Sequence, residues 1–217
     1  MVRLYGVKIE SLVPRFEEYC ALLDPDRRAR VEKRGMTTPG LHTLAGGLLM
    51  RSVLGDAYTK GTVQQNVHGK PYLPDGPAFN LSHAAAYAVL VTADADKNVG
   101  VDIERCREVD YLRLGNRCFH PDEVAWMRAA QNPEQAFFTL WTLKESYLKA
   151  EGCGFSVSPG SVCILPESET TAAIPGDGRR QFRMYPVFPG YCLSVCALEG
   201  DFCERPTMLS PEALAEG

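Results

Sequence analysis

Two short segments of this chain carry acidic side chains at spacings suited to binding a metal ion. In residues 99–104, VGVDIE, valine and isoleucine alternate with glycine and two acids, which predicts a half-buried strand. Alternate residues of a strand point to one face, so Asp102 and Glu104 project together. Two acids on one face repel each other unless a cation lies between them. The pattern therefore predicts either a Mg²⁺ site that also takes substrate phosphates or the solvent face of an edge strand.

The second segment, residues 141–149 (WTLKESYLK), predicts a helix in which Glu145 and Lys149 lie one turn apart on one face. Such pairs are common on helix surfaces, but the aromatic residues Phe137, Phe138 and Trp141 indicate a packed helix. A strand with two carboxylates and a helix with a third carboxylate and a lysine would suit a hard cation together with a phosphate. No histidine or cysteine stands at a sequence spacing typical of a zinc site.

The elements that position these residues follow from capping and turn signals. The sequence DPD at 24–26 predicts the start of a helix, and Gly35 predicts its end. On this helix, Arg27, Arg30 and Arg34 form a basic stripe. The stripe is either a solvated face or a site for an anionic ligand or an acidic partner surface.

A second cap signal, Thr38-Pro39, predicts a buried helix that ends before Gly55. A loop rich in turn residues at 69–77 leads into a short strand. The predicted strands are 79–83, 87–92, 99–104, 161–165, 182–187 and 191–197, with a short helix from Pro121 and a long one at 133–150. Helices with antiparallel strands in each half predict an α+β fold of two similar α/β subdomains, residues 1–105 and 106–217.

Composition excludes several classes of protein. The chain has 217 residues and a net charge of −4, which argues against a nucleic-acid binder. Its apolar runs are too short to span a membrane, and the charged N-terminus does not resemble a signal peptide. Its eight cysteines include no CxxC, so we expect reduced thiols in the cytoplasm.

Five signals in a fixed order resemble the Sfp-type 4′-phosphopantetheinyl transferases. They are GKP at 69–71, FNLSH at 79–83, VGVDIE at 99–104, WTLKESYLK at 141–149 and EG at 151–152. Members of that family transfer the phosphopantetheine arm of coenzyme A to a serine of an acyl or peptidyl carrier protein and release 3′,5′-ADP. The resemblance implies a monomer of two α/β subdomains related by a pseudo-twofold, with coenzyme A bound in the cleft between them.

The resemblance also implies roles for individual residues. Asp102, Glu104 and Glu145 match the family's metal-binding acids, with Mg²⁺ expected and Mn²⁺ an alternative. Lys149 matches the phosphate-binding lysine. The positions that match residues lining the nucleotide and its 3′-phosphate are Lys70, Pro71, Ser82, His83, Arg27, Arg30 and Thr43. The family often has a basic residue before that threonine, where this chain has His42, which implies a differently built 3′-phosphate clamp.

Attack of a serine hydroxyl on the β-phosphorus needs a base, and the candidate is Glu145 or a metal-bound water that it orients. Two roles are possible for Glu123: it orients a metal-bound water, or it is an acid that the helix dipole favours near the start of its helix. The candidate apolar residues for carrier recognition, each of which is alternatively a core residue, are Phe119, Trp126 and Met127. The candidate arginines for steering an acidic carrier protein are Arg105, Arg107, Arg113 and Arg117. Two other functions remain: a non-catalytic module that binds coenzyme A or a carrier protein, and a Mg²⁺-dependent nucleotide diphosphate hydrolase.

Overall fold

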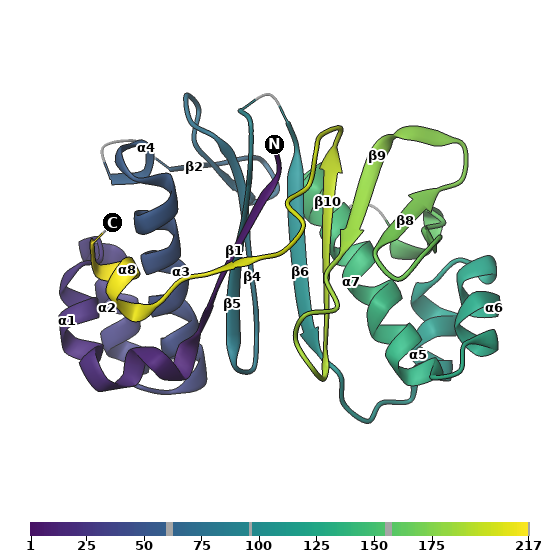
Figure 1. Cartoon of the computed structure of the whole chain (residues 1–217), viewed down its shortest axis with the longest axis horizontal. Helices are drawn as coiled ribbons and strands as arrows, with labels where there is room; N and C mark the ends of the chain where they lie inside the picture. Colours follow the sequence, from purple (N-terminus) through teal and green to yellow (C-terminus); the bar gives the residue numbers. More distant parts are fainter. Residues whose placement is uncertain (60–62, 96, 155–157, 217) are drawn as a thin grey trace.

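The computed structural model describes residues 1–59, 63–95, 97–154 and 158–216. Figure 1 shows two β-sheets side by side in the centre of the molecule, with helices on the outer side of each. The mixed architecture confirms the α+β class. Within the described residues, no helix is both long enough and apolar enough to cross a bilayer.

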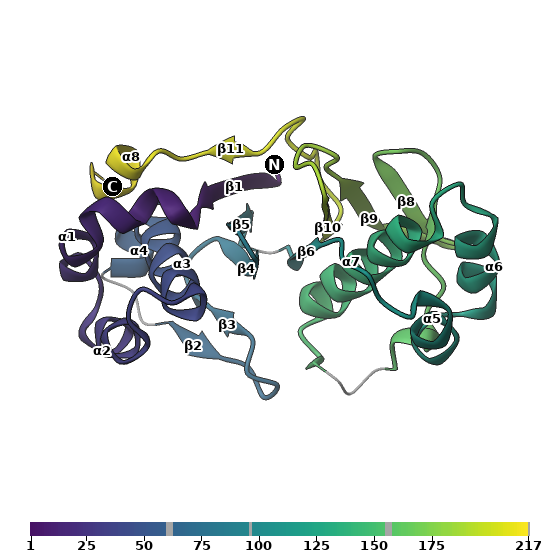
Figure 2. The same cartoon turned by 90° about the horizontal axis from the view of Figure 1, so that it is seen from below.

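The first sheet has the strand order β11-β1-β5-β4. Its strands are β1 (Arg3–Lys8), β4 (Ala78–Ala84), β5 (Tyr87–Ala93) and the short β11 (Thr207–Met208). β5 pairs antiparallel with both β1 and β4, whereas β11 runs parallel to β1. The C-terminal end of the chain therefore returns to the N-terminal strand, as Figure 2 shows from below.

The second sheet has the strand order β6-β10-β9-β8-β7, and its described strands pair antiparallel. Its strands are β6 (Val99–Arg105), β7 (Leu165–Pro166), β8 (Thr171–Ile174), β9 (Asp177–Met184) and β10 (Tyr191–Leu198). A separate hairpin pairs β2 (Gln64–Gln65) with β3 (Pro71–Tyr72). Since β6 belongs to the second sheet and β11 to the first, the chain passes between the sheets more than once, and the division at residue 106 stays a prediction.

Helices cover the first sheet on its outer side (Figure 1). They are α1 (Phe16–Ala21), α2 (Pro25–Arg34), α3 (Thr38–Leu54), α4 (Asp56–Thr59) and α8 (Pro211–Glu216), with a 3₁₀ segment η1 at Ile9–Arg15. The predicted start of α2 is confirmed, because Asp24 Oδ1 accepts a hydrogen bond of 2.9 Å from the Arg27 N–H. The cap of α3 is Thr37, one residue before the predicted Thr38, because its hydroxyl accepts from Gly40.

The second sheet is covered by α5 (Tyr111–Cys118), α6 (Pro121–Ala129) and the long α7 (Pro133–Glu151). The predicted strand at 161–165 is wrong, since η3 (Pro159–Ser161) and the short β7 occupy this segment. Gly100 of β6 lets α7 approach closely, because a Cβ there would collide with the carbonyl oxygen of Ser146. This contact sets the distance between the acidic strand and the helix that carries Glu145 and Lys149.

Aliphatic residues from both sheets form one buried cluster between them, to which Leu4, Val89 and Val91 contribute from the first sheet and Val101 and Val195 from the second. Asn80 adds a polar link, because its side-chain oxygen accepts from the Val101 N–H at 2.9 Å. The edge strands β4 and β6 therefore lie side by side at the centre of the molecule.

Candidate active site between the two sheets

Asp102 is the most buried of the predicted metal ligands, with 5% of its surface exposed. Its Oδ1 accepts hydrogen bonds from Lys149 Nζ at 2.6 Å and from Ser82 Oγ at 2.9 Å. Its Oδ2 is buried and has no hydrogen-bond partner among the residues that the structure describes. Burial raises the pKa of Asp102, and the charge of Lys149 opposes this rise. A buried carboxylate with one unused oxygen is a suitable ligand for a hard cation.

Glu104 and Glu145 approach the same region from β6 and α7. The side chain of Glu104 is 28% exposed, and its carboxylate pairs with Arg107 at 3.1 Å. Burial raises the pKa of Glu145, and the negative charges of Asp102 and Glu104 raise it further. The three carboxylates therefore share one electrostatic environment. Among the residues that the structure describes, the oxygens of these three acids do not all lie within 4.8 Å of one another.

Lys149 joins the two sheets at this point. Besides the ion pair with Asp102, its ammonium donates to Ser82 Oγ and to the carbonyl of Val101, each at 3.2 Å. Ser82 was predicted to line the nucleotide. Its hydroxyl binds Asp102 and receives the Ile103 N–H at 3.4 Å, so it also holds the acidic strand in place.

Lys70 has a different environment from the one its predicted role suggests. Its ammonium donates to the carbonyl groups of Val99 at 3.1 Å and of Ala150 at 3.0 Å, and burial lowers its pKa. The side chain thus ties the loop before β3 to the start of β6 and the end of α7. Lys70 nevertheless lines a cavity of about 220 Å³ together with Pro71, Glu145 and Lys149.

Two further cavities continue from this one toward α2. The larger, of about 870 Å³, shares Pro71 with the first cavity and reaches Arg27 and Arg30. The other, of about 240 Å³, shares both arginines and adds residues from α2, α3 and β4: Arg34, His42, Thr43, Ser82 and His83. We call these three cavities, which share lining residues, the trough; Glu145 and Lys149 line one end of it, and the basic stripe lines the other. The predicted coenzyme A contacts all line it.

The far end of the trough is suited to an anion. Arg27 Nε is buried without a hydrogen bond among the described residues and forms only a long ion pair of 3.8 Å with Asp24. Arg34 donates to the hydroxyl of Thr43 at 2.7 Å, which adds to the site an arginine that the list of predicted contacts lacked. The stripe's spacing of seven residues between Arg27 and Arg34 was the signal that could have identified it.

His42, at the position where the family often has a basic residue, stacks on His83. The two rings lie 4.2 Å apart with an interplanar angle of 14°. A ring nitrogen of His42 is 2.9 Å from the carbonyl of Ala85. Burial lowers the pKa of both imidazoles, and His42 lowers that of His83 further. The basic end of the trough therefore combines arginines with a stacked histidine pair.

Comparisons with known proteins show the family to which this chain belongs. The model of the 4′-phosphopantetheinyl transferase superfamily matches residues 98–196. The 4′-phosphopantetheinyl transferase ffp of Bacillus subtilis is 30% identical over 98% of this chain and all of the relative. The chain belongs to the 4′-phosphopantetheinyl transferase superfamily. The 4′-phosphopantetheinyl transferase gsp of Aneurinibacillus migulanus is 34% identical over 91% of this chain and 86% of the relative. The 4′-phosphopantetheinyl transferase Sfp of Bacillus subtilis strain 168 is 29% identical over 98% of this chain and 100% of the relative.

In this phosphopantetheinyl transferase, Glu123 lies apart from the three acids. It is fully buried, accepts from the His120 and Ile164 N–H groups at 2.7 and 2.6 Å, and pairs with Lys144. Both carboxylate oxygens are thus used inside the C-terminal half. Glu123 forms a capping box with His120 at the start of α6, which is the helix terminus that the helix-dipole interpretation assumed.

The residues predicted to recognise the carrier protein divide into two groups. Phe119 and Met127 are 6% and 0% exposed and belong to the core, whereas Trp126 is only partly buried. Trp126 lines a cavity of about 570 Å³ between α7 and β10. The candidate arginines are exposed at the end of β6 and on α5: Arg105, Arg107, Arg113 and Arg117.

Proposed function

We propose that this transferase moves the 4′-phosphopantetheine group of coenzyme A to a serine of an apo acyl or peptidyl carrier protein, giving holo carrier protein and 3′,5′-ADP. One observation carries the proposal beyond family membership. A buried carboxylate with a free oxygen, Asp102, lies against Lys149 at one end of a trough whose other end holds Arg27 and Arg30. A diphosphate at one end and a 3′-phosphate at the other match this charge pattern.

The acidic end suits the diphosphate. We propose that Asp102, Glu104 and Glu145 hold Mg²⁺, or Mn²⁺ in its place, and the ion when bound would neutralise charge on the pyrophosphate. The donor set supports this assignment, since all three side chains offer carboxylate oxygens, and one of these oxygens, Asp102 Oδ2, is buried without a hydrogen-bond partner among the described residues. Lys149 would donate to a phosphate oxygen while its bond to Asp102 keeps the ammonium oriented.

Glu145 is the proposed base. It would accept the proton of the carrier serine as the serine oxygen attacks the β-phosphorus. The new bond joins serine oxygen to phosphorus, and the bond from that phosphorus to the bridging oxygen breaks. Its electron pair leaves with 3′,5′-ADP. Glu145 lines the same cavity as Lys149, which supports a position beside the reacting phosphate.

The basic end would hold the 3′-phosphate, which Arg27, Arg30 and the Arg34–Thr43 pair would bind with His83. Lys70 and Pro71, which line the cavity that also contains Glu145 and Lys149, would line the nucleotide. We further propose a monomer that works in the cytoplasm. The eight cysteines are free, which suits a reducing compartment.

Intact-mass spectrometry tests the proposal. Apo carrier protein incubated with coenzyme A and Mg²⁺ should gain the mass of one phosphopantetheine, and excess EDTA should stop the gain. A binding module would bind coenzyme A without any change in carrier mass. A hydrolase would release 3′,5′-ADP when no carrier is present. Either result would contradict transferase activity, and a panel of fatty-acid, polyketide and nonribosomal-peptide carriers would identify the preferred substrate.

A further inference from the structure

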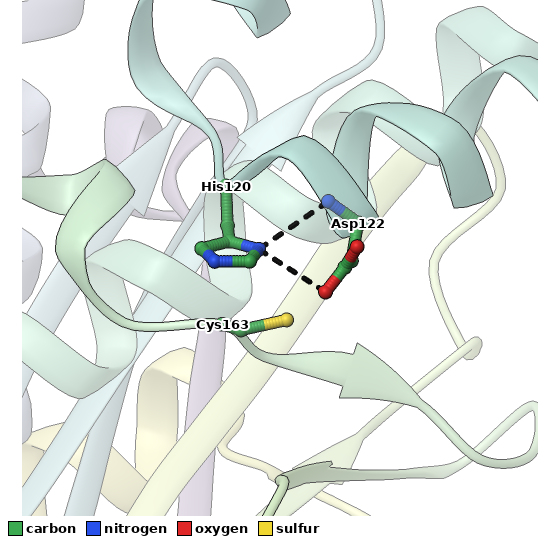
Figure 3. Close-up of side chains that lie close together, drawn as sticks. All are labelled: His120, Asp122 and Cys163. Atoms are coloured by element: carbon green, nitrogen blue, oxygen red, sulfur yellow. Dashed lines mark hydrogen bonds and ion pairs between the residues drawn. The ribbon is translucent and has the colours of Figure 1, made fainter.

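Three side chains at the start of α6 and in the segment before β7 lie together, outside the elements β6 and α7 that carry the acidic site. His120, Asp122 and Cys163 offer one ligand atom each, and these atoms all lie within 4.8 Å of one another (Figure 3). His120 Nδ1 is 3.5 Å from an Asp122 carboxylate oxygen. Figure 3 shows the Cys163 sulfur directed toward both. Sequence spacing did not indicate this group, because the fold brings residue 163 next to residue 120.

A buried ion pair fixes the backbone on which these ligands stand. One Glu123 oxygen accepts from the N–H of His120, and the other accepts from the N–H of Ile164. Lys144 pairs with Glu123 and donates to the carbonyl of Val162. The peptide groups on both sides of the cysteine are therefore held by the same buried pair that holds His120. Such outer contacts orient metal ligands in known sites.

The charges around the cysteine favour a cation. Asp122 and Glu123 place negative charge near the Cys163 sulfur, and Lys144 opposes them with one positive charge. The start of α6 has a partial positive charge, but Asp122 and a cysteine thiolate would together supply two negative charges. The exposed fraction is 34% for the His120 side chain and 70% for Asp122, so water and ions reach the group.

We propose that His120, Asp122 and Cys163 bind a divalent transition-metal ion of the zinc type, with water as the fourth ligand. Imidazole, thiolate and carboxylate are the ligands zinc takes, in a tetrahedral arrangement. The thiol proton would be released to solvent as the sulfur–metal bond forms. His120 Nδ1 would exchange its long 3.3 Å hydrogen bond from the Asp122 N–H for the metal. The bound ion would link the start of α6 to the segment before β7.

This site differs from the proposed Mg²⁺ site in chemistry and does not depend on the proposed function. The acidic site offers oxygen atoms alone, whereas this group offers nitrogen and sulfur. Excess Mg²⁺ can therefore occupy the acidic site while a softer ion is titrated into the other one.

Titration of the metal-free full-length protein with CoCl₂ and then ZnCl₂, in excess MgCl₂, tests the proposal. Wild type should bind one equivalent and show a thiolate-to-cobalt charge-transfer band that zinc removes. Cys163→Ser should abolish the band. His120→Asn should weaken affinity by about 100-fold or more, since even loss of an outer contact costs roughly 10–100-fold. Asparagine is a strong helix cap, so this variant keeps the start of α6.

Two controls separate the site from general metal binding. Cys203→Ser removes a different half-buried thiol and should bind cobalt as wild type does. Asp102→Asn alters the acidic site and should also retain the band. Absence of the band in wild type would overturn the proposal, as would equal affinity in wild type and Cys163→Ser. If His120→Asn does not fold, judged by circular dichroism in EDTA, Cys163→Ser and its cysteine control decide the question.

Discussion

The Lys149 ammonium lies 2.6 Å from Asp102 Oδ1, so a predicted phosphate ligand and a predicted metal ligand hold each other in the free protein. The lysine uses one carboxylate oxygen and leaves the other, Oδ2, without a partner among the described residues. The Asp102 side chain is 7% exposed and that of Lys149 is 28% exposed, which reduces the screening of the pair by water. The same contact therefore positions both groups before substrate binds.

A double-mutant cycle measures this relationship. Asp102→Asn, Lys149→Met and the double variant should show a coupling free energy of about 1–3 kcal/mol in urea unfolding. The exposed pair Arg28–Glu32, at 2.7 Å, is the matched control, and its coupling should be only about 0.3–0.5 kcal/mol. Additive effects of the Asp102 and Lys149 substitutions would show that the contact contributes no more than the surface pair.

Glu145→Gln should lower kcat for carrier modification by about 10²–10⁴-fold while the thermal unfolding midpoint changes little. The substitution keeps the shape of a half-buried side chain and removes its ability to accept a proton. Glu134→Gln, on the same helix, is the control and should retain near-normal activity. Rapid formation of holo carrier by Glu145→Gln would rule out Glu145 as the base.

Local signals in the sequence predicted much of this structure. The helix at 25–34 follows from a side-chain cap and a proline, which act within one turn. The strand with Asp102 and the helix with Glu145 follow from their periodicity, and these elements meet because Gly100 permits close packing. The order of the motifs supported the family resemblance, and the predicted coenzyme A contacts line the trough.

Long-range contacts could not be predicted in the same way. The segment 161–165 has a strand-like composition, but Glu123 and Lys144 take up the backbone groups of Ile164 and Val162, which a sheet would otherwise pair. The Lys70 ammonium meets carbonyl groups 29 and 80 residues away, and no local pattern encodes those partners. Side-chain roles set by tertiary contacts therefore require the structure.

Arg30→Ala should raise KM for coenzyme A by about tenfold or more but leave KM for dephospho-coenzyme A nearly unchanged. A hydrogen bond to a charged group is worth roughly 1.5–3 kcal/mol, and only coenzyme A carries the 3′-phosphate. Arg28→Ala is the control, since Arg28 is on the same helix but pairs with Glu32. An equal rise in KM for coenzyme A and for dephospho-coenzyme A would place Arg30 outside the 3′-phosphate site.

Arg113→Glu with Arg117→Glu should raise KM for an acidic carrier protein on the order of tenfold at low salt and spare coenzyme A. Both arginines are exposed on α5. Arg107 is unsuitable for this test, because it pairs with Glu104 in the acidic site. Arg3→Glu with Arg205→Glu makes the same change of net charge at other exposed positions. If that control raises KM for the carrier equally, steering depends on total charge and not on α5.

The stability of the free protein should fall as pH decreases below 6.5, in part because of His42. Burial lowers the pKa of His42 from its ordinary value of 6.5. At a pH between the His42 pKa of the unfolded chain and the lower one of the folded protein, only the unfolded chain binds the proton. Acidification therefore favours unfolding until the pH falls below the folded pKa. His42→Gln removes this contribution and should flatten the pH dependence of the free energy of unfolding, measured in urea. Parallel curves for wild type and variant would mean that His42 takes up its proton equally in both states.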